Sequence, residues 1–249
     1  MRRLRATIPA AALLAAAMLA SAGCATVEGR VDPAMFPAAR EAAADRSTAA
    51  PSARDRSAAD RSPVAIGLAL PAQLVAQEHL GERLNDSTAT RVRVPIGRIV
   101  EAAGLRALAE TFEGGVRRTD DGDLRADSGD PAGAVAAVVA ITRIEVDYRD
   151  ELRYFVPLGP LILSDSRLTL RLVLGAELRD PAGRPLWSKT LDSGAIEPHT
   201  LRSPLAKGYE DRPTSVIRLA HQAAWRLLLD LAREARDWVE AEHSRERRL

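Results

Sequence analysis

The clearest constraint on the fold is an alternating stretch, SRLTLRLVLGAELR, at residues 166–179. Every second residue is apolar and most residues between are polar, which is the period of a β-strand with one buried face. The apolar set is Leu168, Leu170, Leu172, Leu174, Ala176 and Leu178. DPAG at 180–183 then fits a type I turn, and RPLWSKTLD returns as a hairpin partner. The chain must therefore contain a sheet with one covered and one solvated face.

Four other segments read as strands. Residues 64–70, VAIGLAL, form a continuous apolar run that ends at a proline, which is typical of a buried strand. Residues 90–95 alternate, a short strand follows Gly114-Gly115, and residues 135–148 are strand-like throughout. The first half of that last segment is apolar on both faces, so it is expected near the centre of the sheet.

Two segments have the period of an amphipathic helix. Residues 96–112 place Ile96, Ile99, Val100, Ala103, Ala107 and Leu108 on one side. Residues 215–240 repeat Val216, Leu219, Ala223, Leu227, Leu231 and Trp238 at helical spacing. Thr214 or Ser215 is the expected N-cap of the second helix. Residues 73–84 fit either a short helix or an ordered loop.

These elements predict an α+β fold. Two helices interrupt a run of strands, and the strands are expected to pair mainly antiparallel. We expect a two-layer sandwich with the helices packed on one face of the sheet. Residues 63–249 are enough for a single domain of this kind.

The N-terminus has the layout of an export signal. Arg2, Arg3 and Arg5 give a positive start, and residues 8–20 are almost wholly apolar. Small residues then lead to Cys24. This pattern predicts a signal peptide at residues 1–23. The alternative is an uncleaved transmembrane helix, but a span needs about 20 apolar residues and this run is shorter.

Cys24 is the only cysteine in 249 residues. A structural disulfide would need a second cysteine, and a catalytic thiolate would need a nearby group that lowers its pKa. The neighbouring Ala, Gly and Thr residues supply neither. LASAGC resembles the lipobox of bacterial lipoproteins, although Ser21 stands where a leucine is usual. We therefore predict that Cys24 is the lipid attachment site and mature N-terminus, carrying acyl chains such as palmitate that anchor it in a membrane.

Residues 24–62 are predicted to form the acylated N-terminus and a disordered tether. The stretch is rich in Ala, Arg, Asp, Ser and Pro, and ADRS or RDRS occurs three times. A chain of this composition cannot bury enough apolar surface to offset the entropy cost of ordering. A coil of this length would reach on the order of 35 Å, which would hold the domain off the membrane surface.

The charge balance argues against a nucleic-acid partner. The whole chain has 35 basic and 34 acidic residues, so it carries a formal net charge of +1. Removal of residues 1–23 takes away three arginines and no acid, which makes the balance about −2. A nucleic-acid binder is expected to show a strong basic excess.

The sequence contains no catalytic, cofactor or metal motif that stands out. Its four histidines are scattered without the spacing of a zinc site, and there is no nucleophile elbow or phosphate-binding loop. The aspartates within residues 120–130 lack the glycine and glutamate of a calcium-binding EF-hand, so an exposed turn is expected there. We predict no enzymatic activity and no cofactor.

One segment remains as a candidate contact site. YFVPLGPLIL, residues 154–163, is uncharged and lies between two strands that have charged faces. It is either a connection that folds back over the core or a hydrophobic lip that contacts a partner protein or lipid. The residues proposed for that contact are Phe155, Leu158, Leu161 and Ile162.

Taken with the lipobox, several patterns within residues 64–240 resemble small bacterial envelope lipoproteins. These are the first apolar strand, VPIG leading into a helix that ends at Phe112, the strand LTLRLVLGAELRDPAGRPLWS and the Ala/Leu-rich last helix. The resemblance is to the YajG-like lipoproteins and to auxiliary lipoproteins of ABC-type transport systems. It implies a lipid-anchored domain that faces the periplasm and has no known enzymatic activity. Ala25, in place of the aspartate linked to inner-membrane retention, favours the outer membrane.

Three functions compete at this point. The favoured hypothesis is a non-enzymatic envelope lipoprotein that binds a component of an assembly or transport machine. The second is a module that binds a lipid or small ligand, with residues 154–163 at the mouth of an apolar groove. The third is an unrecognised hydrolase. A free apolar surface or sheet edge would favour the first, an internal apolar cavity the second, and a convergent cluster of His, Asp and Ser the third.

Overall fold

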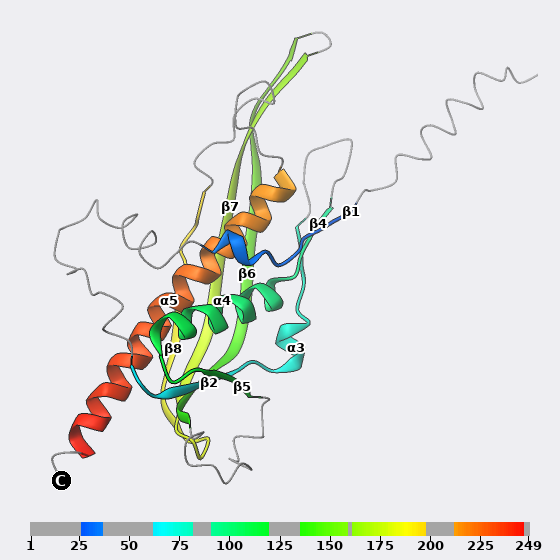
Figure 1. Ribbon diagram of the computed structural model, residues 1–249. Coiled ribbons are helices and arrows are strands. Elements are labelled where there is room, and N and C mark those ends of the chain that lie inside the picture. The colour runs from blue at the N-terminus through cyan, green and yellow to red at the C-terminus, as the bar shows by residue number, and fades with distance from the viewer. Residues whose placement is uncertain are drawn as a thin grey trace, which may run out of the picture.

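Two sheets and a layer of helices make up the fold (Figure 1). The computed structural model describes residues 26–36, 62–81, 91–119, 135–158, 161–197 and 212–246. The elements, in chain order, are β1 (Thr26–Glu28), the 3-10 helix η1 (Pro33–Met35), β2 (Ala65–Ala69), α3 (Ala72–Val75), β3 (His79–Gly81), β4 (Arg91–Val94), α4 (Ile96–Thr111), β5 (Val116–Thr119), β6 (Val135–Leu158), β7 (Leu161–Arg179), β8 (Pro185–Asp192) and α5 (Arg212–Glu246).

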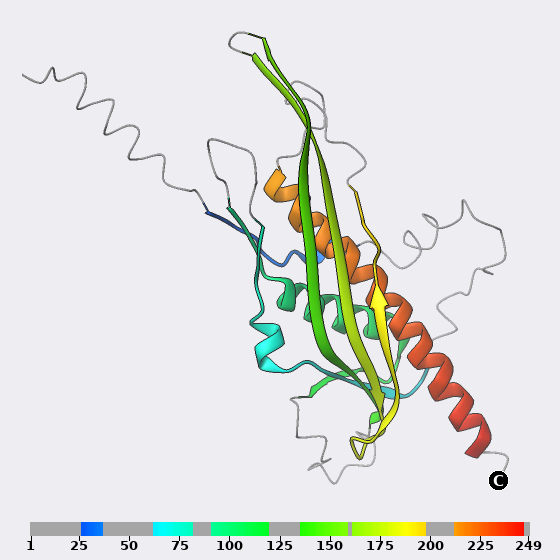
Figure 2. The same ribbon diagram turned by 180° about the vertical axis from the view of Figure 1, so that it is seen from behind.

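The main sheet has the strand order β5-β2-β6-β7-β8. Both α4 and α5 lie on one of its faces, and the view from behind shows the other face uncovered by helices (Figure 2). The predicted α+β sandwich, with helices packed on one face of the sheet, is therefore confirmed.

Strands β6, β7 and β8 form the antiparallel half of the sheet. The predicted turn between β7 and β8 is present, because the Gly183 N–H donates to the Asp180 carbonyl at 2.9 Å. Gly183 has a φ of 82°, a left-handed conformation that costs glycine little. Sequence-local pairing of this kind is what the DPAG motif predicts.

The sheet is mainly antiparallel, as predicted, but its other side is parallel, which the sequence did not predict. Strand β2 pairs in parallel with both β5 and β6. The connection from β2 to β5 contains α4, and a crossover through a helix returns the chain in its original direction. The crossover that contains α4 therefore makes the sheet mixed.

The core lies between the helices and the covered face of the sheet. All six apolar residues predicted for β7 are at most 1% exposed. The predicted face of α4 is also buried, with exposures from 0% to 2%. On α5 the residues Val216, Leu219, Ala223, Leu227 and Leu231 are buried, and Trp238 is partly buried against them. The period of the sequence pattern thus identified the buried side of β7, α4 and α5.

Helix α5 spans 35 residues and begins earlier than predicted. Since it starts at Arg212, neither Thr214 nor Ser215 is its N-cap, and that prediction is wrong. Ser215 is 1% exposed inside the first turns of the helix. In the described part of the chain, no helix has a stretch with both the length and the hydropathy needed to span a bilayer.

A second, smaller sheet brings the N-terminal segment onto the domain. Its order is β1-β4-β3, with β1 parallel to β4 and β3 antiparallel to it. The chain then crosses α5 as η1 (Figure 1). Residues 24–62 were expected to form a tether, but residues 26–36 lie on the domain instead. The proposed tether is therefore confined to residues 37–61, which fall outside the described ranges.

Candidate functional site

The site residues predicted from sequence fall in two places. Cys24 lies outside the described residues. Phe155, Leu158, Leu161 and Ile162 lie at the far end of the hairpin formed by β6 and β7. Backbone pairing continues to that end, with Leu158 opposite Leu161 and Phe155 opposite Ser164.

The hairpin projects beyond the end of α5 and away from the body of the domain (Figures 1 and 2). Strand β6 has 24 residues and β7 has 19, whereas their neighbour β8 has only 8. Segment 154–163 is therefore not a connection that folds back over the core. Its two arms continue the strands, so β6 runs past Tyr148 and β7 begins before Ser166.

The described histidines do not converge on a reaction centre. The His79 ring lies 6.5 Å from that of Tyr148, and burial lowers the pKa of His79 while Asp147 opposes that shift. On α5, His243 Nδ1 lies 3.0 Å from the Val239 carbonyl oxygen. Within the described ranges there is no group of three or more metal-ligating side chains. His199 and the acidic residues 120–130 lie outside those ranges.

The N-terminal segment, residues 26–36, is held on the helices by one aromatic side chain. Phe36 is 3% exposed, and its ring centroid lies 5.1 Å from that of His221 and 5.9 Å from that of Trp225. Burial of a phenylalanine side chain contributes about 1.5–3 kcal/mol, here to the docking of the segment. Phe36 is thus the apolar anchor of the segment.

His221 provides a polar contact beneath that anchor. It is fully buried, and its Nε2 accepts a hydrogen bond of 3.1 Å from the backbone N–H of Asp32. Its Nδ1 lies 2.8 Å from the Ile217 carbonyl oxygen, so Nδ1 carries the proton and donates it. Burial lowers the pKa of His221, against smaller opposing effects of the Ile217 carbonyl and Asp32. The docked state therefore requires the neutral ring.

Arg106 of α4 covers the other side of the segment. Its Nη1 donates to the Pro33 carbonyl at 2.7 Å, and its guanidinium carbon lies 5.5 Å from the centroid of the Trp225 ring. An ion pair with Glu110, at 3.2 Å, orients the guanidinium. Trp225 itself is fully buried, and its indole N–H has no hydrogen-bond partner among the described residues.

Acidification is expected to loosen the N-terminal segment. Burial holds the pKa of His221 below its ordinary value of 6.5, and a charged ring would also aim a second N–H at the Asp32 N–H, so docking disfavours the proton. The stabilisation of the docked segment by His221 is complete above pH 6.5. It is lost as the pH falls through the lowered pKa of His221. Among the described residues, Asp32 on the segment is the charged group that acts on the ring, and Arg106 on α4 binds the neighbouring Pro33 carbonyl.

The measurement is the amide hydrogen-exchange protection of Gly29 and Asp32, corrected for the intrinsic effect of pH on exchange. The variant His221→Gln keeps a hydrogen-bond acceptor but does not titrate. The protection of the Gly29 and Asp32 amides in this variant should therefore stay constant as the pH is lowered. An identical pH profile in the two proteins would show that His221 does not control docking.

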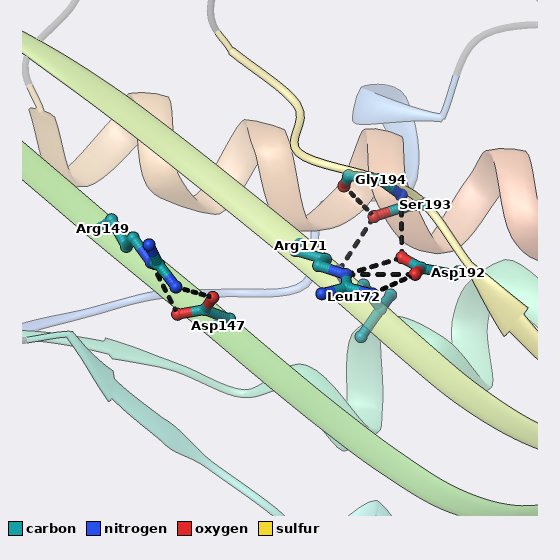
Figure 3. A network of polar contacts seen from close by, with 7 residues as sticks. All are labelled: Asp147, Arg149, Arg171, Leu172, Asp192, Ser193 and Gly194. Atoms are coloured by element: carbon teal, nitrogen blue, oxygen red, sulfur yellow. Dashed lines mark hydrogen bonds and ion pairs between the residues drawn. The ribbon is translucent and has the colours of Figure 1, made fainter.

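The uncovered face of the sheet carries ion pairs between neighbouring side chains (Figure 3). Arg171 binds Asp192 through Nε, at 2.9 and 3.1 Å, and through Nη2. On the neighbouring strand, Arg149 Nη2 lies 3.1 Å from Asp147 Oδ2. Arg143–Glu145 at 3.4 Å and Arg179–Glu177 at 2.9 Å continue the pattern. Each arginine of this set has a carboxylate beside it, which leaves the set without a net positive charge.

Asp192 ends strand β8 and organises the turn that follows. Hydrogen bonds from Arg171 and from the Gly194 N–H lower its pKa to about 2. Ser193 Oγ accepts a hydrogen bond of 2.9 Å from the Leu172 N–H, which ties the same turn to β7. The carboxylate is therefore ionised at neutral pH, and its role here is to hold a turn.

Sequence reasoning missed the docking of residues 26–36 and the residues that receive it. The repeats and polar composition of residues 24–62 dominated the interpretation of that region. A usable signal was present, because Phe36 is the only aromatic residue between Cys24 and Ser62. His221, one of the four scattered histidines, packs in the core and accepts one hydrogen bond.

Comparison with known proteins gives remote likenesses. No protein-family model matches the chain, and no curated protein matches it in sequence. Among solved structures it is similar to a minor lipoprotein from Acinetobacter baumannii, with 17% identity, 72% of this chain and 94% of that chain covered, and a TM-score of 0.31.

A second likeness is to a protein from Helicobacter pylori described as a neuraminyllactose-binding hemagglutinin homolog. The identity is 10%, 75% of this chain and 91% of that chain are covered, and the TM-score is 0.40. The case for the function of this chain therefore rests on its own residues.

Proposed function

We propose that this protein is a lipid-anchored lipoprotein of the bacterial envelope. In this proposal it faces the periplasm at the outer membrane, binds a component of an assembly or transport machine and catalyses no reaction. The observation that carries the proposal is the projecting β6–β7 hairpin with an uncharged segment at its tip. A ribbon whose strands pair only with each other leaves its outer backbone edges for strand addition, and an uncharged sequence suits an apolar contact.

The pairing pattern explains why the hairpin is suited to recognition. From Arg149, opposite Thr169, to Leu158, opposite Leu161, the described structure pairs β6 and β7 only with each other. An isolated two-stranded ribbon gains little stability from its own contacts. Contact with a partner would cover this part of the ribbon, and the charged face lower on the same strands would stay in water.

The test is capture of partners by the full-length lipoprotein from its native envelope after crosslinking. Leu161→Asp/Ile162→Asp is expected to abolish recovery of the partner that the wild-type protein enriches, since two carboxylates at the tip cannot be buried cheaply. Arg149→Gln, on the same hairpin, is the matched control and should leave recovery unchanged. Equal recovery with the double variant, in a protein of unchanged thermal stability, would contradict the hairpin as the contact.

The anchor is tested separately with Cys24→Ser. The proposal expects this variant to lose its acyl chains and to leave the membrane fraction, because each buried CH₂ group contributes about 0.8 kcal/mol to anchoring. Unchanged membrane fractionation and unchanged electrophoretic mobility would contradict acylation at this position. Recovery of bulk lipid alone, with no reproducible protein, would support the alternative of a lipid- or ligand-binding module.

A further inference from the structure

The docked N-terminal segment begins two residues after Cys24. Strand β1 starts at Thr26, and its register with β4 runs from Thr26 opposite Arg91 to Glu28 opposite Arg93. An extended chain spans at most about 3.3–3.6 Å per residue, so the Cα atom of Thr26 lies within about 7 Å of that of Cys24. The chain therefore offers almost no slack between the acylation site and the folded domain.

We propose that residues 26–36 hold the domain directly on the membrane surface, with the β1-β4-β3 sheet as its membrane-proximal part. This inference rests on the proposed acylation of Cys24. The occupant of this surface is the lipid bilayer that receives the acyl chains. The domain then has a defined orientation on the membrane, whereas a coil of residues 24–62 would leave it free at a reach on the order of 35 Å.

The contact between the segment and the domain begins at β1. Beyond the β1–β4 ladder, the Gly29 N–H donates to the Arg93 carbonyl at 2.8 Å. A Cβ atom at Gly29 would lie 3.0 Å from both that carbonyl oxygen and Ile217 Cγ1, so the segment lies closely between β4 and α5. Force on the acyl anchor is therefore transmitted first to a backbone ladder.

The segment is also fastened at its other end. The hydrogen bonds to His221 and Arg106 follow within four residues of Gly29, and the buried Phe36 closes the contact. The contacts thus extend from the first residue of β1 to the last described residue of the segment. Detachment would have to break strand pairing, side-chain hydrogen bonds and an apolar contact together.

The small sheet presents a mixed surface to the proposed membrane side. Leu80 on β3 and Glu28 on β1 both lie opposite Arg93 in the register, so their side chains share one face. Leu80 is 43% exposed, and Arg93 lies between Glu28 at 3.6 Å and Glu78 at 3.4 Å. The C-terminal end of α5 lies far from this sheet in both views (Figures 1 and 2). A label at Leu80 is therefore expected to lie near the membrane, and a label at the C-terminal end of α5 is expected to lie far from it.

The experiment measures energy transfer from a labelled domain to labelled lipid headgroups. Once Cys24 is acylated the protein has no free thiol, so Leu80→Cys and Glu242→Cys each provide one labelling site. The acylated full-length protein is placed in vesicles of phosphatidylethanolamine and phosphatidylglycerol that contain an acceptor lipid. We expect high transfer from the label at position 80 and low transfer from the label at position 242. Equal transfer from the two positions would overturn the proposed orientation.

Two variants test the role of the segment. Phe36→Ala/Arg106→Ala removes the aromatic anchor and one hydrogen bond, and a flexible Gly/Ser linker inserted between Ala25 and Thr26 leaves all packing intact. Each should lower the transfer from position 80 toward that from position 242. Unchanged transfer with the linker would contradict the proposal, even if the double variant fails to fold.

Failure of the two proposals can be told apart. Mass spectrometry and flotation with vesicles are measured first on the same protein. Protein that lacks acyl chains and does not float contradicts anchoring, and the orientation falls with it. Protein that floats but transfers energy equally from both positions contradicts the orientation alone.

Discussion

Gly97→Ala is expected to destabilise the protein by about 3 kcal/mol or more, because the new methyl group would meet fixed backbone atoms. Its Cβ would lie 1.8 Å from the Leu74 carbonyl oxygen and 2.6 Å from that of Val75, at the C-terminal end of α3. The Gly97 N–H also donates to the Gln77 carbonyl at 3.1 Å, which holds the two backbones together. Urea unfolding followed by circular dichroism measures the loss.

Gly104→Ala is the matched control in the same helix. Here the new Cβ would lie 3.0 Å from Leu68 Cδ2, the end of a side chain that can move by a few tenths of an ångström. Alanine also gains about 0.8–1.0 kcal/mol in helix propensity over glycine, so the net change should be small. Equal losses at the two positions would contradict the close packing of α3 on α4.

Trp225→Ala is expected to cost about 3–5 kcal/mol, the range for removal of a large aromatic side chain from a core. Trp225 is fully buried and touches the ring of Phe36, and Arg106 stacks over it. The cavity would therefore weaken both the α4–α5 interface and the docking of residues 26–36. Thermal unfolding should show the global loss, and hydrogen exchange at Gly29 should show the local one.

Trp225→Phe separates packing from hydrogen bonding. Phenylalanine keeps most of the apolar volume and removes an indole N–H that has no partner in the described part of the protein. A buried donor without a partner costs about 1–3 kcal/mol, so its removal should offset much of the lost contact area. A loss as large as that of Trp225→Ala would mean that the indole N–H is satisfied in solution.

Local periodicity carried most of what the sequence could predict. The alternation at residues 166–179 identified the six buried residues of β7 because strand side chains alternate between faces within a few residues. The helical face of α4 followed from the same kind of short-range rule. The DPAG turn was equally local, since its hydrogen bond joins Asp180 to Gly183.

Short-range periodicity and turn motifs do not predict which distant segments pair with each other. The parallel ladders of β2 join it to β5 and β6, across a helix and a second sheet. Likewise, β6 and β7 continue as a ribbon to Leu158 and Leu161. The uncharged sequence of that region fits a folded-back connection equally well, so only the backbone pairing decides between the two.

The contact role of Phe155, Leu158, Leu161 and Ile162 stays a prediction. The residues at the hairpin tip were identified from their lack of charge, and the structure places them at the end of a projecting ribbon. The N-terminal segment was missed because composition averages over many residues, whereas docking depends on one aromatic side chain. Phe36 and its partners His221 and Trp225 are close in space and far apart in sequence.

The hydrogen bond between Asp32 and His221 joins residues that are 189 positions apart. Its acceptor belongs to α5, the last helix of the chain. If the chain is exported N-terminus first, as proposed, β4 and Arg106 are available before α5, but the contacts of residues 32–36 with His221 and Trp225 must wait for that last helix. Until then the segment would lack the contacts that fasten its end at Phe36. Full docking of residues 26–36 would therefore be among the last steps of folding, because its final contacts join the two ends of the described chain.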